Sequence, residues 1–286
     1  MENGARPAIY AAGGLRAHLP AAQCARRPSP APPTHPTLEM QVEEYIHEVL
    51  SRPSQLNDFP RRLVLPDRLV VAFSALFVAG EREGREYGCN LTYEEQTGEL
   101  IQSQRYVGDS NSCPIRPMAH WENCADVHCH PADSIGDVGG YSPHSMEDFL
   151  SFSDQLHKPL FIRFVVSHDR VYAAVYRKGY TRYDAGGIYD VNGELREAID
   201  GYFEEFCPVG QEERNDALVQ AQLRVLDRGE DGNQATARLM IEYKRRTPGL
   251  GEHTADATMR ACRKVASRFR FGFYERDGTY GLARLE

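Results

Sequence analysis

The sequence predicts an α/β fold in which helices flank a mixed sheet, and three observations carry this prediction. Apolar residues recur at helical spacing over 41–51, and an uncharged apolar run over 69–79 indicates a core helix. Apolar segments separated by turn residues predict β-hairpins over 86–107 and 159–176. An extended segment at 126–130 and a further helix lie between the hairpins. The order helix, hairpin, strand, helix, hairpin is typical of layered α/β structures.

Local signals place the boundaries of these elements. A short strand is expected within 63–69, where Pro66 interrupts it. In the first hairpin the strands are expected at 86–94 and 100–107, with a turn at Thr97 and Gly98 between them.

A helix is expected to begin at Ser142 and Pro143. Serine is a favoured N-cap, and proline suits the first helical position. Phe149, Phe152 and Leu156 follow at helical spacing and mark its buried face.

Three parts are expected along the chain. Residues 1–40 are rich in Ala, Pro, Arg and Gly and predict a disordered segment. A targeting peptide, or an over-long start before Met40, are the alternatives. Residues 41–185 would form the core domain and 186–286 a helix-rich C-terminal extension, either a separate module or packed on the core. Within the extension we expect helices at 195–206, 217–226 and 255–269 and a final hairpin around Asp277-Gly278.

The composition narrows the class of protein. Hydrophobic residues make up 41% of the 286 residues, enough for a packed core, and the net charge of -8 with a pI near 5.7 argues against a nucleic-acid binder. The seven cysteines contain no CxxC pair, which favours free thiols in a reducing compartment. The most apolar run is too short to cross a bilayer. We therefore expect a cytoplasmic protein that binds no nucleic acid and no membrane.

A pair of histidines suggests a metal site. His128 and His130 in His-Cys-His-Pro alternate on an extended segment, so both imidazoles project from one face and can reach one ion. Ser145-x-x-Asp148 follows, and Asp148 can supply a carboxylate ligand. Ser-x-x-Asp also resembles a capping box. Because Ser142 is expected to cap the helix, Asp148 is expected to be free of that duty. Three protein ligands would leave one position open for water, as in catalytic zinc sites.

Together with Glu86-Tyr87-Gly88, these motifs resemble the JAMM (JAB/MPN) metalloprotease family over roughly residues 63–178. That family's pattern is a strand-borne Glu followed closely by Gly, then His-x-His-Pro, then Ser-x-x-Asp. The resemblance implies a JAB/MPN-like fold with cytidine-deaminase-like layering.

The same resemblance implies the roles of the site residues. His128, His130 and Asp148 would bind Zn²⁺, Glu86 would act as the general base, and Ser145 would hydrogen-bond the oxyanion. The implied activity is that of a zinc metalloprotease or isopeptidase. Its substrate would be a protein, with a ubiquitin-like protein as the leading class.

Several residues compete for these roles. The segment between His130 and Asp148 is longer than in the family, with Gly136 to Gly140 as the flexible candidate for an insertion, and Asp133 and Asp137 in it are substitute ligands. Glu81 and Glu83 are alternatives to Glu86 as the base, but they are expected to be solvated surface residues. Cys124 and Cys129 could form part of a structural zinc site, although Cys129 is rather expected to be a buried apolar residue. His144 is expected to be an exposed loop residue, and Trp121 and Tyr141 are expected to be packing residues that flank the site.

Three other functions remain as hypotheses. A non-catalytic JAB/MPN-type scaffold or binding module would keep the fold without turnover. A toxin or antiviral effector would use the C-terminal part to select its target. Asp126-Val-His-Cys-His also fits the opening of barrel-type metallohydrolases, but only 156 residues follow it, too few for that barrel of about 250 residues.

Overall fold

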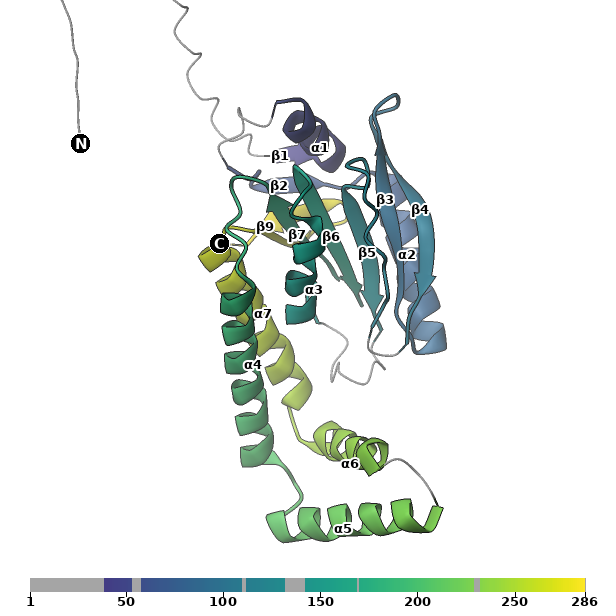
Figure 1. Cartoon of the computed structure of the whole chain (residues 1–286), viewed down its shortest axis with the longest axis vertical. Helices are drawn as coiled ribbons and strands as arrows, with labels where there is room; N and C mark the ends of the chain where they lie inside the picture. Colours follow the sequence, from purple (N-terminus) through teal and green to yellow (C-terminus); the bar gives the residue numbers. More distant parts are fainter. Residues whose placement is uncertain are drawn as a thin grey trace, which may run out of the picture. The chain divides into compact units, whose positions relative to one another are not determined.

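A mixed sheet forms the centre of the fold, as expected for the α/β class (Figure 1). The computed structural model describes residues 39–52, 58–109, 112–131, 142–168, 170–228 and 232–285, without the side chains of 221, 222, 224–235, 237 and 238. The predicted disordered segment therefore lies outside the described residues, except for Glu39 and Met40, which belong to the first strand.

The described residues contain a nine-stranded sheet in the order β1-β2-β9-β8-β7-β6-β5-β3-β4. β1 with β2 and β5 with β6 are parallel pairs, and the other neighbours are antiparallel. The strands are β1 (Glu39–Gln41), β2 (Arg62–Val64), β3 (Tyr87–Glu94), β4 (Glu99–Val107), β5 (Ala125–His130), β6 (Leu160–Ser167), β7 (Arg170–Arg177), β8 (Gly272–Asp277) and β9 (Gly281–Arg284).

Two helices cover one face of the sheet, α1 (Val42–Ser51) and α2 (Asp67–Glu83). α2 begins after Pro66 and ends at Gly84, whose positive φ of 61° suits glycine. Its buried side at Leu69, Phe73, Leu76 and Gly80 follows helical spacing and packs into the first apolar core.

The other face is covered by α3 (Met146–Leu150), the 3-10 helix η1 (Ser151–Gln155), α4 (Ala185–Phe206) and α7 (Leu250–Phe269). Figure 1 shows α3 in front of the sheet and α2 behind it. α4 and α7 lie side by side, and a Cβ at Gly187 would come within 2.6 Å of the Phe269 ring. This close approach explains why glycine occupies the first turn of α4.

The end of the expected extension is part of the central sheet. β8 pairs with β7, and β9 pairs with β2, so the last hairpin connects the N-terminal strands β1 and β2 to the rest of the sheet. The turn at Asp277-Gly278 lies where the sequence indicated, with φ of 75° at Gly278. α5 (Gln211–Arg228) and α6 (Gly232–Arg246) pack on each other, and a small apolar cluster around Phe203, Tyr243 and Leu250 joins them to α4 and α7.

Two expectations about helices were wrong. The helix expected from Ser142 begins at Met146, because residues 142–145 are extended and Ser145 is the N-cap. α4 begins ten residues earlier than expected, since Gly186 and Gly187 at its start weaken the helical signal, although Gly187 is buried against Phe269 of α7. α6 was not expected at all.

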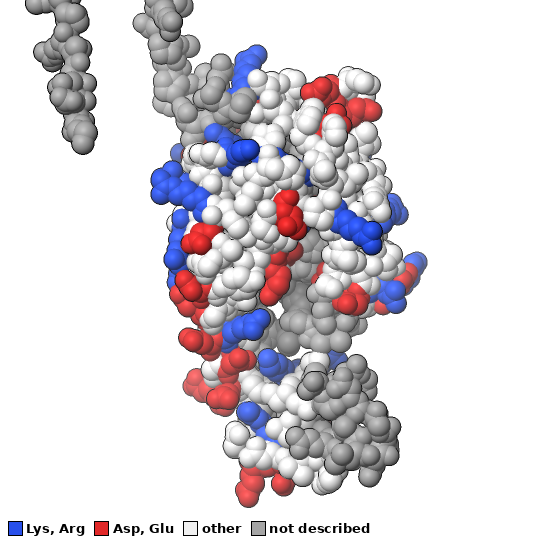
Figure 2. All heavy atoms as spheres, in the orientation of Figure 1, with Lys and Arg blue, Asp and Glu red and all other residues white. Residues whose placement is uncertain are grey.

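Charges of both signs are spread over the face that Figure 2 shows, and α4 carries several acidic residues. Some are paired, as in Lys264 with Glu194 and Lys244 with Asp200. The six cysteines in the described part are free thiols. None of the described helices combines the length and apolar character that a membrane span requires.

Candidate metal centre

The strand register brings three polar side chains to one face of the sheet. Gly88 of β3 pairs with His128 of β5. Because side chains alternate along a strand, His130 lies on the same face as His128, and Glu86, two residues before Gly88, lies beside them. Glu86 immediately precedes β3, and its backbone is held by hydrogen bonds to Asp109 and Gly108 at the end of β4. Main-chain pairing therefore places the carboxylate.

Glycine at position 88 has a packing reason. A Cβ there would lie 2.7 Å from Ile115 and 2.8 Å from the sulfur of Cys113, so the segment that follows β4 rests directly on this residue. The Glu-x-Gly spacing thus lets this segment pack close to the histidine pair.

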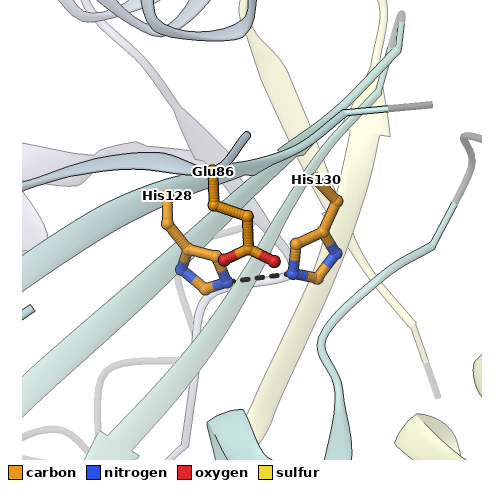
Figure 3. A group of neighbouring side chains, drawn as sticks. All are labelled: Glu86, His128 and His130. Carbon is orange, nitrogen blue, oxygen red and sulfur yellow. Dashed lines mark hydrogen bonds between the residues drawn. The ribbon is translucent and has the colours of Figure 1, made fainter. Parts of the chain in front are cut away.

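Glu86, His128 and His130 form a buried cluster that could hold a metal ion (Figure 3). Their ligand atoms lie within 4.8 Å of one another, and the Nε2 atoms of the two histidines are 3.0 Å apart. Figure 3 shows the Glu86 carboxylate between the imidazoles of His128 and His130. Among the described residues, this is the one place where three or more His, Cys, Asp or Glu side chains lie close enough together to share a metal ion.

Asp148 of α3 approaches the same two imidazoles. Its Oδ1 is 3.3 Å from Nε2 of His128, and its Oδ2 is 4.0 Å from Nε2 of His130. A tetrahedral ion with bonds of about 2.0–2.1 Å separates its ligand atoms by about 3.3 Å. The distances from Nε2 of His128 to Nε2 of His130 and to Oδ1 of Asp148 are thus close to the spacing that one such ion requires, whereas the approach of Asp148 to His130 is longer.

Asp148 is also part of a capping box, contrary to our expectation that Ser142 would take that role. Ser145 caps α3: its Oγ accepts a hydrogen bond from the Asp148 amide at 3.1 Å, and its own amide donates to Oδ2 of Asp148 at 2.8 Å. The Ser145 hydroxyl donates to the same Oδ2 at 3.0 Å. The cap therefore holds Oδ2 and leaves Oδ1 turned to His128, so capping and metal binding are compatible in one carboxylate.

Burial and neighbouring charges shift the pKa values of the site residues. Burial and, to a smaller extent, the charge of His128 lower the pKa of His130 to about 4, so His130 is neutral at pH 7. Burial also acts against a charged His128, but the Asp148 carboxylate outweighs it and raises the pKa of His128. Although burial disfavours its charged form, the charges of His128 and Arg163 hold the pKa of Asp148 well below its usual value.

A hydrogen bond outside the cluster orients His130. Its Nδ1 lies 3.3 Å from the carbonyl oxygen of Ser142. With the proton on Nδ1, the lone pair of Nε2 points toward His128 and Asp148. Metal-binding histidines are commonly oriented by a hydrogen bond of this kind.

The rival residues lie elsewhere. Glu83 ends α2 and hydrogen-bonds Tyr87 and Arg82, and Glu81 is exposed on the same helix. Cys129 points to the opposite face, where its sulfur accepts a hydrogen bond from the Tyr87 amide at 3.2 Å. Cys124 is buried in the same core before β5. Asp133, Asp137, Tyr141 and Gly136 to Gly140 lie outside the described residues.

Two expectations about flanking residues were wrong. His144 is buried rather than exposed: its Nε2 donates to the Arg163 carbonyl at 3.0 Å, and burial lowers its pKa to about 3. It anchors the segment that leads into α3. Trp121 precedes β5, at the end of the strand opposite to His130, and stacks on His120 instead of flanking the cluster.

The sequence analysis did not identify a buried ion pair on the same strands as the histidine pair and its neighbour. Asp126 on β5 and Arg163 on β6 are register partners and form two hydrogen bonds, at 2.9 and 2.5 Å. A signal was present, because Arg163 is the one charged residue in the apolar run of β6 and needs a buried partner there.

Comparison with known proteins identifies no family for this chain. No family model matches it, and neither does any curated protein or solved structure.

Proposed function

We propose that the protein is a zinc-dependent hydrolase of the JAMM type that cleaves peptide or isopeptide bonds. The observation that carries the proposal is the buried Glu86 carboxylate beside two histidine nitrogens and an aspartate oxygen at ligand spacing. Two imidazoles and one carboxylate are a usual zinc donor set, and a second carboxylate at the same place can act as a base. The sheet, with α2 on one face and α3 on the other, is compatible with JAB/MPN-like layering.

We propose a separate role for each residue of the site. His128, His130 and Asp148 would hold zinc, which when bound lowers the pKa of a water toward about 7 and polarises a carbonyl. Glu86 accepts the proton of the attacking water and returns it to the leaving amine. The burial of these side chains keeps bulk water from competing for their hydrogen bonds.

Ser145 is proposed to stabilise the oxyanion. Its hydroxyl donates to Oδ2 of Asp148, but that oxygen also accepts the Ser145 amide. The hydroxyl can therefore turn toward a substrate oxygen without leaving Oδ2 unpaired. A ubiquitin-like protein is proposed as substrate on the family resemblance alone.

Replacing Glu86 by glutamine tests the proposal. The change keeps the shape of the side chain but removes its ability to accept a proton. We expect turnover of isopeptide-linked and linear di-ubiquitin to fall by at least about 10²–10⁴-fold. Zinc content, measured by elemental analysis, should stay near one ion per chain.

The matched control is Glu83→Gln, because Glu83 lies three residues earlier, at the partly exposed end of α2. This variant should cleave the probes at the parent rate. Loss of zinc in Glu86→Gln would instead make Glu86 a ligand. If the parent protein contained no zinc and His128→Ala changed nothing, a non-catalytic scaffold would replace this proposal.

A further inference from the structure

The buried guanidinium of Arg163 connects the strands of the site to the helix that carries Asp148. Its Nε and Nη2 donate to both oxygens of Asp126, at 2.9 and 2.5 Å. Its Nη1 donates to the Asp148 carbonyl at 3.0 Å and to the hydroxyl of Ser151. All three nitrogens of the planar group thus donate hydrogen bonds, to acceptors on β5, on α3 and at the start of η1.

The surroundings leave Arg163 little freedom to move. Its guanidinium lies 5.6 Å from the centre of the Phe152 ring, and only 7% of the residue is exposed. Its carbonyl accepts the hydrogen bond from His144, so the segment that leads into α3 is fastened at the same residue. Both ends of α3 are therefore tied to one position of β6.

Asp126 lies on the same face of β5 as His128 and His130. The fork from Arg163 to Asp126 therefore holds β6 and α3 in place against the strand that bears both histidines. Nη1 lies 3.8 Å from Oδ1 of Asp148, the oxygen that faces His128.

We propose that Arg163 is a positioning residue that sets the metal affinity of the site by holding Asp148 at ligand distance from His128. This inference rests on the proposed metal site and adds a residue outside the ligand set. The planar fork is the essential feature, because a single ammonium can satisfy Asp126 or α3 but not both. Supporting residues of this kind change metal affinity by about 10–100-fold when they are replaced.

Arg163→Lys tests the proposal, because it keeps the charge and removes the fork. We expect the dissociation constants for Zn²⁺ and Co²⁺, measured by competition with a chelator, to rise about 10–100-fold. The visible absorption of the bound Co²⁺ should shift, because Asp148 no longer meets the ion at the same angle. A role limited to stability would leave the spectrum of the folded protein unchanged.

The matched control is Arg177→Lys. Arg177 is another buried arginine, at the far end of β7, where it donates to the Asp58 carbonyl. Its replacement should leave metal affinity and spectrum as in the parent. Parent-like affinity and spectrum in Arg163→Lys would overturn the proposal.

A second variant decides the question if Arg163→Lys does not fold. Asp126→Asn keeps the size of the side chain but replaces one accepting oxygen with an amide group, which weakens the fork. Weaker Co²⁺ binding in this variant supports the proposal, and parent-like binding overturns it. If the parent protein binds no metal, the proposed function fails together with this inference. If the parent binds metal and Arg163→Lys binds it equally well, only this inference fails.

Discussion

At the scale of single residues, Asp148 shows how one carboxylate can serve both folding and a metal site. Its two oxygens are separated by role: Oδ2 receives the hydrogen bonds of the cap, and Oδ1 faces His128. Ser-x-x-Asp therefore does not have to be either a capping box or a ligand motif. The cap itself orients the ligand, because the backbone of the first helical turn fixes the carboxylate plane.

Ser145→Ala should separate the two roles of the serine. Loss of the cap should lower the free energy of unfolding by about 0.5–2 kcal/mol, measured by denaturant titration. Loss of the oxyanion donor should lower kcat by about 10²–10³-fold even when zinc saturates the site.

Ser145→Thr is the matched control, because threonine keeps the hydroxyl and can also cap a helix. Most of the stability and part of kcat should return in this variant. An alanine variant with parent-like kcat at saturating zinc would restrict Ser145 to capping.

At the scale of elements, the last hairpin is the feature that unites the chain. β8 and β9 lie between β7 and β2, so strands from both ends of the sequence depend on it. α7 adds Val265, Phe269 and neighbouring residues to the core that also contains Phe149 of α3. α5 and α6 differ, because their apolar cluster is separate from both sheet cores.

Truncation after residue 185 should therefore destroy the fold. β7 would lose its pairing with β8, β2 would lose its pairing with β9, and the apolar face that α4 and α7 cover would meet water. We expect insoluble protein without bound zinc, assessed by solubility and metal content after expression.

A shorter internal deletion is the matched control. Residues 210–247, which contain α5 and α6, can be replaced by a short Gly-Ser linker, because Tyr202 of α4 stacks on His253 of α7 at 4.1 Å between ring centres. This variant should remain folded and bind zinc with parent affinity. A soluble, zinc-binding 1–185 fragment would contradict the role assigned to the hairpin.

At the scale of the whole molecule, the proposed metal site joins three separate parts of the chain. Glu86 precedes β3, the histidines lie on β5, and Asp148 lies in the first turn of α3. The unfolded chain has no preformed site, so metal binding is expected to stabilise the folded state.

Zinc should therefore raise the Tm. At a free concentration one hundred times its Kd, a ligand adds about 2.7 kcal/mol. With roughly 2–4 °C per kcal/mol for a chain of this size, the Tm should rise by about 5–10 °C, and a chelator should reverse the rise. Calorimetry with zinc and after chelation measures the shift.

Two variants check the origin of that shift. Glu86→Gln should show the full rise, because Glu86 is proposed as a base. His128→Ala should show little or none, because a ligand is missing. An equal rise in His128→Ala would place the bound zinc elsewhere on the protein.

Much of the fold was predictable because its signals are local. The apolar spacing of α2, the alternation in β5 and the turn residues at Gly98 and Gly278 each act over a few neighbours. The prediction that the helix starts at Ser142 was wrong for the same reason. Ser142 and Ser145 are both possible N-caps, and local sequence does not decide between them. The start of α4 was not predicted because its glycines lower the helix propensity, and the contact of Gly187 with Phe269 of α7 is not visible in the local sequence.

The sequence by itself determined the α/β class, most strands, and the face on which His128 and His130 lie, because each depends on the period of the backbone. Tertiary structure decided which distant segments meet. Leu63 pairs with Leu282, and Arg163 joins Asp126 to α3, with no local pattern to announce either contact. It also decided that Asp148 both caps α3 and faces His128, because that geometry exists only when α3 is docked on the sheet.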